Sequence, residues 1–284
     1  SAERLITSDG VKAIVGGDCS GVTTAVLNNV AKPNGIVMIS PSATSPALST
    51  IEDNGLFFRT APSDARQGVI VAEILKEKGI SEIAITYTNN DYGKGLADAI
   101  DTNFQKMGGT VTINVPHEDG KGDYTAEVGA LAAAGGEVLV VAGYVDQGGR
   151  GIVQSSVDTG AFDTFYFPDG MVSPQLATNH GSDIDGSFGA NPGTDSPGAA
   201  TYGEMAEAAG FKAGPFSAES YDAAALIMLA MEAAKSAESN DLKGKIMDVA
   251  NAPGEKIFPG QLGKALEIIR GGGDVDYVGG SAVE

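Results

Sequence analysis

Short runs of apolar residues alternate with amphipathic stretches along almost the entire chain. The run Val138–Val141 contains no polar residue, which is typical of a strand buried on both faces of a parallel sheet. The stretch from 64 to 78 instead repeats its apolar residues at helical spacing, at Val69, Ile70, Ala72, Ile74 and Leu75. This alternation predicts an α/β fold of doubly wound parallel sheets that carry helices on both faces.

The same patterns predict the positions of the individual elements. We expect strands at 12–15, 36–39, 56–59, 82–87, 110–115, 138–141, 164–167 and 187–190. We expect helices at 3–8, 23–31, 64–78, 92–107, 124–134, 147–159, 173–178, 199–209, 218–234, 242–249 and 260–270.

Two breaks in the alternation predict crossings between two lobes. At Arg59–Ser63 a strand ends in Ala–Pro before a new helix, and Ala190–Ala199 has the Gly/Pro/Ser-rich composition of a connector. We therefore predict one lobe from residues 1–61 plus 192–279 and another from 62–191, with 280–284 starting a further crossover. Two lobes joined in this way form a hinge with a ligand cleft between them.

Composition narrows the classes of function. The chain has 284 residues, of which 42% are apolar, and this length is sufficient for two domains. Its formal net charge of −19 argues against binding to nucleic acid and against docking on anionic lipid. No apolar run approaches the roughly 20 residues of a membrane helix, so we expect no direct membrane insertion.

The two ends of the sequence also carry information. The chain opens at Ser1 inside a predicted helix, without a Met or a signal peptide, and stops where another strand would begin. We therefore expect a processed or trimmed chain that lacks pieces of the fold at both ends.

No constellation of catalytic residues is recognisable. The sequence has no Gly-x-Ser-x-Gly elbow, no Walker loop, no GxGxxG motif opening a helix and no Cys/His cluster for zinc. The single cysteine, Cys19, cannot form an internal disulfide, and neither His117 nor His180 lies in a motif that would supply a base. We expect a protein that is not an enzyme and that uses no cofactor or metal.

Two loops rich in serine and threonine follow predicted strands, in KAIVGGDCSGVTTA (12–25) and GIVMISPSATSPAL (35–48). Ser20 and Thr23 follow the first strand, and Ser42 and Thr44 follow the second. Hydroxyls and free backbone N–H groups at such strand ends attract small anions. The alternative is that Ser20 and Thr23 only cap a helix and that Thr44 is a turn residue.

Three further candidates follow strands of the second lobe. Tyr92 lies at a helix start in ITYTNNDYGKGLA, Tyr144 follows the strand in VLVVAGYVDQGG, and Asp169 follows the strand in FYFPDGM. In a parallel sheet all three lie at the carboxyl edge, where α/β proteins bind ligands. The alternatives are packing tyrosines and, for Asp169 before Gly170, a turn former.

With these residues the chain resembles the type I periplasmic solute-binding proteins of ABC importers, in the branch of Leu/Ile/Val receptors. The matching stretches are IVGGDCSGVTTA, VMISPSATSPAL, FFRTAPSD, NNDYGKGLA, VVAGYVDQGG, FYFPDGM and PFSAESYDAAAL. The resemblance implies a periplasmic receptor, or one anchored at the cell surface of a Gram-positive, with an amino-acid ligand and a membrane permease as partners.

The resemblance also implies a role for each candidate. Ser20 and Thr44, with backbone N–H groups near Ser42, would bind the α-carboxylate of an amino acid, and Asp169 would pair with its α-ammonium. Tyr92 and Tyr144 would close over the ligand, and Phe216 is a candidate for the side-chain pocket. In chain order, the candidate ligand-binding residues are Ser20, Thr23, Ser42, Thr44, Tyr92, Tyr144, Asp169 and Phe216.

Two other functions remain open at this point. An amide or amino-acid sensor subunit of a regulatory system has the same fold and would signal to a partner. An α/β enzyme would need a catalytic pair in the cleft, and the sequence offers none.

Overall fold

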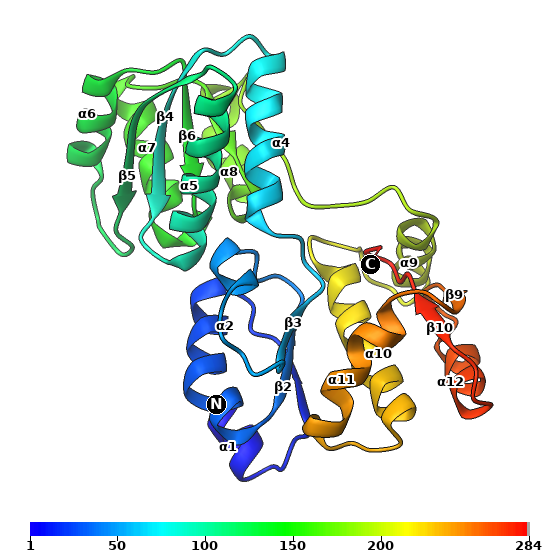
Figure 1. Ribbon diagram of the computed structural model, residues 1–284. Helices are drawn as coiled ribbons and strands as arrows, with labels where there is room; N and C mark the ends of the chain where they lie inside the picture. The colour runs from blue at the N-terminus through cyan, green and yellow to red at the C-terminus, as the bar shows by residue number, and fades with distance from the viewer. Residues whose placement is uncertain (283–284) are drawn as a thin grey trace. The chain divides into compact units, whose positions relative to one another are not determined.

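The computed structural model describes residues 1–282, which fall into two units by their internal contacts (Figure 1). Unit 1 contains residues 1–44, 50–61 and those from 193 onward, and unit 2 contains 45–49 and 62–192. The short segment 45–49 belongs to unit 2 because Pro46 packs on helix α5 (Asp91–Lys106) of that unit, where a Cβ at Gly95 would lie 2.9 Å from the Pro46 ring.

Unit 1 contains a three-stranded parallel sheet in the order β1-β2-β3 and a separate parallel pair, β9 and β10. Its strands are β1 (Ala13–Val15), β2 (Val37–Ser40), β3 (Phe57–Arg59), β9 (Glu255–Ile257) and β10 (Val275–Tyr277). Its helices are α1 (Ala2–Thr7), α2 (Ser20–Val26), η1 (Leu27–Ala31), α3 (Lys32–Asn34), α9 (Pro197–Ala208), α10 (Ser217–Ala234), α11 (Ser239–Ala250) and α12 (Leu262–Arg270).

One apolar core holds unit 1 together. Val37 and Ile39 of β2 pack with Leu226 of α10 and Ile246 of α11, and all four side chains are buried. Tyr277 of β10 belongs to the same cluster, so the core joins both sheets of the unit.

Unit 2 contains a five-stranded parallel sheet in the order β5-β4-β6-β7-β8. Its strands are β4 (Glu82–Thr88), β5 (Thr110–His117), β6 (Val138–Ala142), β7 (Phe165–Phe167) and β8 (Phe188–Gly189). Its helical segments are η2 (Pro46–Ser49), α4 (Asp64–Glu77), α5 (Asp91–Lys106), α6 (Thr125–Ala134), η3 (Val145–Gly149), α7 (Arg150–Thr159), η4 (Asp169–Met171), α8 (Pro174–His180) and η5 (Gly181–Ile184).

Alternate residues of the central strands feed two separate cores. Ile83 and Ile85 of β4 pack under α4 and α5, whereas Ala84 between them packs under α6 and α7. Successive side chains of a strand point to opposite faces, so a strand buried on both faces must be apolar throughout. The predicted α/β class with parallel sheets covered on both faces is confirmed in this unit.

The observed elements differ from the predicted ones in a few places. The predicted helix at 23–31 begins earlier, at Ser20, and changes from α to π geometry at Leu27. Strand β9 was not predicted, because Glu255 and Lys256 are exposed and only Ile257 carries an apolar signal. The crossover predicted for 280–284 extends to residues 283–284, outside the described residues.

Within residues 1–282, no helix combines the length and the apolar character that crossing a bilayer requires.

Candidate functional site

Three of the predicted site residues lie at the carboxyl ends of neighbouring strands of unit 2. Tyr92 lies in the first turn of α5, after β4, and the side chain of the N-cap residue Asn90 fixes this turn by accepting a hydrogen bond from Gly93 N at 2.9 Å. Tyr144 follows β6, and Asp169 follows β7. The sheet order places β4, β6 and β7 side by side, so these three residues share one edge.

Asp169 is held by two side-chain donors that reach the same oxygen. Gln67 Nε2 donates to Asp169 Oδ1 at 2.8 Å, and the Tyr92 hydroxyl donates to Oδ1 at 3.0 Å. The Tyr92 oxygen in turn accepts a hydrogen bond from Gly170 N at 3.2 Å. Among the described residues, no side chain donates to Oδ2, and a backbone hydrogen bond from Asp169 itself also stabilises the ionised carboxylate.

An aromatic wall stands beside this carboxylate. The rings of Tyr92 and Tyr144 are stacked, with centroids 4.7 Å apart and an interplanar angle of 30°. Gly170 permits this close packing, because a Cβ there would collide with the Gly143 carbonyl and approach both tyrosine rings within 3.1 Å.

Burial governs the ionisation of the group. It raises the pKa of Asp169 above its ordinary value, while the hydrogen bonds from Gln67 and Tyr92 act in the opposite direction. The pKa of Tyr92 is raised by burial and by the neighbouring carboxylates Asp169 and Asp64, so this phenol stays protonated and remains a donor.

Two members of the cluster were not predicted. Gln67 lies on α4, 102 residues before Asp169 in sequence, and no local pattern indicates this pairing. Tyr166 of β7 has a fully buried hydroxyl without a hydrogen-bond partner, and burial followed by the charge of Asp169 raises its pKa. The only sequence signal for Tyr166 was its position three residues before Asp169. That signal was weak, because an aromatic residue in a buried strand is usually an ordinary core residue.

The predicted residues of unit 1 surround the start of α2 and the end of β2. Ser20 and Thr23 are 1% and 0% exposed, and Thr44 is 1% exposed. The hydroxyls of Thr23 and Thr44 have no hydrogen-bond partner within the described part of the chain. Cys19 is the N-cap of α2, and no side chain makes a capping bond there. Ser20 and Thr23 therefore lie inside the helix and are not its N-cap residue.

Ser42 and the residue before the loop, Ser40, organise the backbone of unit 1 here. Ser42 Oγ donates to the carbonyl of Asp18 at 2.8 Å and lies 2.9 Å from its Oδ1. Ser40 Oγ donates to Gly17 O at 2.6 Å and accepts from Ala43 N at 3.0 Å. Ser40 was not predicted, because it belongs to the strand itself; it ties the two hydroxyl-rich loops together.

Phe216 is the N-cap of α10 in unit 1 and is only partly buried. Its φ of 59° lies in the left-handed region, which is costly for a side chain of this size. Such an outlier is a common mark of a functional position.

The two histidines and the single cysteine form no metal centre. Groups of three or more His, Cys, Asp or Glu side chains suited to a metal ion are absent from the described residues. His117 is fully buried, with Nδ1 2.9 Å from Thr86 Oγ1 and Nε2 3.1 Å from Thr88 Oγ1. Burial lowers its pKa to about 4, so this imidazole is neutral at pH 7.

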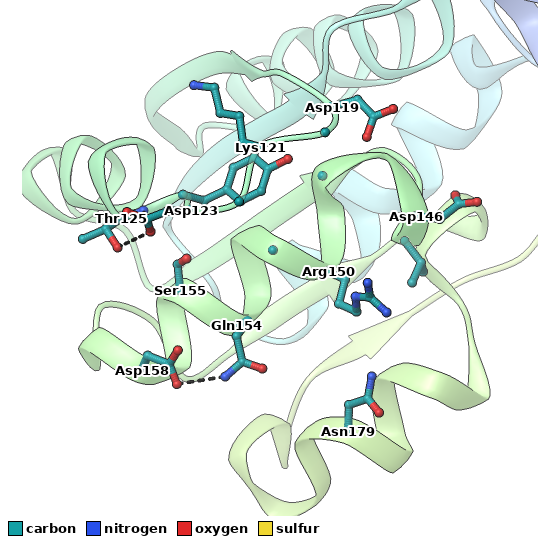
Figure 2. A pocket seen from close by; sticks show the side chains of 16 residues that line it. Asp119, Lys121, Asp123, Thr125, Asp146, Arg150, Gln154, Ser155, Asp158 and Asn179 are labelled. Atoms are coloured by element: carbon teal, nitrogen blue, oxygen red, sulfur yellow. Dashed lines mark hydrogen bonds between the residues drawn. The ribbon is translucent and has the colours of Figure 1, made fainter.

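A polar pocket of about 810 Å³ lies elsewhere in unit 2, between the loop that precedes α6 and helix α7 (Figure 2). Its wall includes Arg150, Asp146 and Asn179, and Gln154 Nε2 donates to Asp158 Oδ1 at 2.8 Å along its rim. None of the predicted ligand-binding residues lines this pocket. It is therefore distinct from the cluster around Asp169.

The fold and these residues define a class of binding protein. Residues 1–259 match the family described as periplasmic binding protein, and the chain belongs to this family. It is 33% identical, over 262 residues, to the Leu/Ile/Val-binding protein homolog 1 of Brucella melitensis, covering 90% of this chain and 67% of that one. The resemblance noted from the sequence is confirmed.

Solved structures agree on the fold. A leucine-binding protein from Thermotoga maritima superposes with a TM-score of 0.80 at 21% identity, covering 99% of this chain and 74% of that one. A branched-chain amino-acid transporter substrate-binding protein of Streptococcus pneumoniae, in complex with isoleucine, gives a TM-score of 0.72 at 23% identity, covering 88% and 72%. These proteins are binding proteins, in agreement with the absence of a recognisable catalytic motif from the sequence.

Proposed function

We propose that this protein is an extracytoplasmic receptor that binds a small amino acid, branched-chain or similar, and delivers it to the membrane permease of an ABC importer. Asp169 carries this proposal. Two donors occupy its Oδ1, and its Oδ2 is available to the amino group of a ligand. A buried ammonium requires a negatively charged acceptor, and the Asp169 carboxylate would supply it.

The carboxylate end of the same ligand would be bound by the hydroxyl loops of unit 1. Thr44 and Thr23 have buried hydroxyls without partners, and Ser20 lies at the first residue of α2. A buried hydroxyl without a partner costs free energy unless a ligand satisfies it. Ser42 would act mainly through the backbone near it, because its own hydroxyl is bonded to Asp18.

Aromatic residues would cover the side chain of the ligand. The stacked rings of Tyr92 and Tyr144 offer a flat apolar wall beside Asp169. Phe216 is our candidate for the pocket that receives the ligand's side chain.

The relatives support an amino acid as the ligand and transport as the role. The names of the Brucella and Thermotoga proteins refer to Leu/Ile/Val and leucine, and the Streptococcus protein was solved with isoleucine. A periplasmic location, or attachment at the surface of a Gram-positive cell, follows from this role.

Titration calorimetry tests the proposal with three ligands of similar size. L-Leucine has both charged ends, 4-methylpentanoate lacks the amine, and 3-methylbutylamine lacks the carboxylate. We expect L-leucine, or L-isoleucine or L-valine in its place, to bind at least about a hundredfold more tightly than either analogue, because each loses a charged hydrogen bond. Equal affinity for 4-methylpentanoate and L-leucine would overturn the assignment.

A further inference from the structure

The two ends of the Gln67 amide differ in their hydrogen bonding: within residues 1–282 the nitrogen has a partner and the oxygen has none. The residue lies in the first turn of α4, and its Nε2 donates to Asp169 Oδ1 at 2.8 Å. Its other end, Oε1, is buried and has no hydrogen-bond partner among the described residues. An ionised carboxylate can only accept hydrogen bonds, so the amide nitrogen must face Asp169 and the carbonyl must face away.

This arrangement is unfavourable for stability alone. A buried carbonyl without a partner has lost its hydration and gained nothing in exchange. A methionine of the same length would fill the position without that loss, beside the apolar residues of α4 such as Val71 and Leu75. The value of glutamine at position 67 therefore lies in its donor end.

The donor end acts on the charge and the orientation of Asp169. Tyr92 and Gln67 reach Oδ1 from helices α5 and α4 respectively, so the carboxylate is fixed from two directions. We propose that Gln67 is a positioning residue, which keeps the Asp169 carboxylate ionised and oriented, with Oδ2 left for the amino group of the ligand. The ligand in this inference comes from the proposed function. The effect of Gln67 on the charge and orientation of Asp169 rests on the geometry of unit 2 alone.

The surroundings of Asp169 make a second donor necessary. Burial favours the neutral acid, and four titratable groups interact with the cluster. They are the phenols Tyr92 and Tyr166, and the phenol of Tyr144 and the carboxyl of Asp64, which both interact with Tyr92. None of these four groups is a cation. Neutral donors alone therefore stabilise the ionised form of Asp169 before the ligand arrives.

The test compares two Gln→Met substitutions in unit 2. Gln67→Met removes the bond to Asp169. Gln154→Met removes a bond of the same kind and the same 2.8 Å length, from Gln154 Nε2 to Asp158 Oδ1, on the exposed surface of α7. Both variants lose one Gln–Asp hydrogen bond, and only the first involves the proposed ligand site.

The first measurement needs no ligand. The pKa of Asp169 is followed by carbon-13 NMR of the side-chain carboxyls, with Asp169→Asn to assign the signal. We expect the pKa to rise in Gln67→Met and to remain unchanged in Gln154→Met. An unchanged pKa in Gln67→Met would overturn the inference, whatever the protein binds.

The second measurement is the affinity for L-leucine at pH 7.5 together with the melting temperature. We expect Gln67→Met to weaken binding about tenfold to a hundredfold while its melting temperature stays equal or rises. A lower melting temperature with unchanged affinity would assign Gln67 a purely structural role. If the unmodified protein binds no amino acid, the proposed function fails, and the NMR result still decides the role of Gln67.

Gln67→Glu provides a second variant with nearly the same shape. It replaces the donor by a second carboxylate, so we expect Asp169 to bind a proton at a higher pH than in Gln67→Met. A pKa of Asp169 below that of the unmodified protein would contradict the proposed role.

Discussion

The two units each contain an enclosed aspartate, and the two carboxylates are satisfied in different ways. In unit 1, Asp222 of α10 is fully buried. Its Oδ1 accepts from Tyr277 OH at 2.8 Å and from Gly280 N at 3.0 Å, and its Oδ2 accepts from Ser281 N at 2.7 Å and Ser281 Oγ at 2.5 Å. In unit 2, the side-chain donors of Asp169 reach Oδ1 alone.

The difference separates an acid that the protein satisfies by itself from the acid that we propose binds the ligand. Asp222 has donors on both oxygens and connects α10 to the segment after β10, so the protein itself uses its full capacity to accept hydrogen bonds. No side chain within residues 1–282 donates to Asp169 Oδ2, in a site that disfavours an uncompensated charge. The proposed ligand-binding role of Asp169 rests on this incomplete pairing with side-chain donors, not on burial alone.

The largest expected effect comes from removing the structural acid. Asp222→Ala leaves buried donors on Tyr277, Gly280 and Ser281 without an acceptor. We expect it to lower the free energy of unfolding by about 3–5 kcal/mol, measured by urea denaturation. A loss below about 1 kcal/mol would mean that these donors find water, and the contrast with Asp169 would fail.

Removing the binding acid should affect ligand affinity instead. We expect Asp169→Ala to weaken the binding of L-leucine by about 2–4 kcal/mol, because the ligand's ammonium loses its charged partner. Stability in the absence of ligand should remain equal or increase, since an enclosed charge is removed. Calorimetry that shows unchanged affinity would refute the role of Asp169.

His117, a third buried polar group, shows that complete hydrogen bonding of a buried side chain also occurs in unit 2. Both ring nitrogens of His117 in unit 2 have threonine partners, and burial lowers its pKa from 6.5 to about 4. The unfolded chain therefore binds more protons than the folded one between pH 6.5 and 4, and stability falls as the pH decreases through this window. The shift corresponds to roughly 2–3 kcal/mol.

Comparison of His117→Gln with the unmodified protein isolates this contribution from the many carboxylates. We expect the variant to be less stable at pH 7, and the difference in unfolding free energy to shrink by roughly 2–3 kcal/mol as the pH is lowered to 4. A difference that is independent of pH would show that His117 has the same pKa in the folded and unfolded chains, which would contradict the expected shift.

The smallest expected effect concerns a neutral hydroxyl. Thr44 Oγ1 is buried without a partner within residues 1–282, so Thr44→Val should leave stability unchanged or slightly higher and weaken L-leucine binding by about 1–2 kcal/mol. Thr60→Val is the matched control in unit 1, because Thr60 Oγ1 donates to Glu219 O at 2.9 Å. Thr60→Val should lower the free energy of unfolding and leave the affinity for L-leucine unchanged. The opposite result for the two variants would contradict the distinction between partnered and unpartnered hydroxyls.

The sequence predicted the fold through its strongest signal, the continuous apolar runs of doubly buried strands such as Val138–Ala142. Strand β9 escaped prediction because two of its residues are exposed and charged. Tyr92, Tyr144 and Asp169 could be grouped in advance, because the ends of parallel strands meet at one edge. Gln67 could not, because only the folded chain brings the first turn of α4 to Asp169.

The hydroxyl loops show the same limit. Sequence patterns placed Ser20 and Thr23 at the start of a helix, and they left open whether these residues cap it. The structure assigns the N-cap position to Cys19 and places Ser20 and Thr23 within the helix. Which hydroxyls have partners depends on contacts over 20 residues or more, such as Ser40 with Gly17, and such contacts follow from packing rather than from local pattern.

The hydrogen bond between Gln67 and Asp169 also suggests where a fluorescent label could be attached to follow ligand binding. Arg66, the neighbour of Gln67 in the first turn of α4, is exposed to solvent. A fluorophore attached at position 66, after replacement of Cys19, would therefore lie one residue away from a bond whose environment changes when the amine arrives. Under the proposed role of Asp169, the fluorescence of this label would report the binding of the ligand's amine.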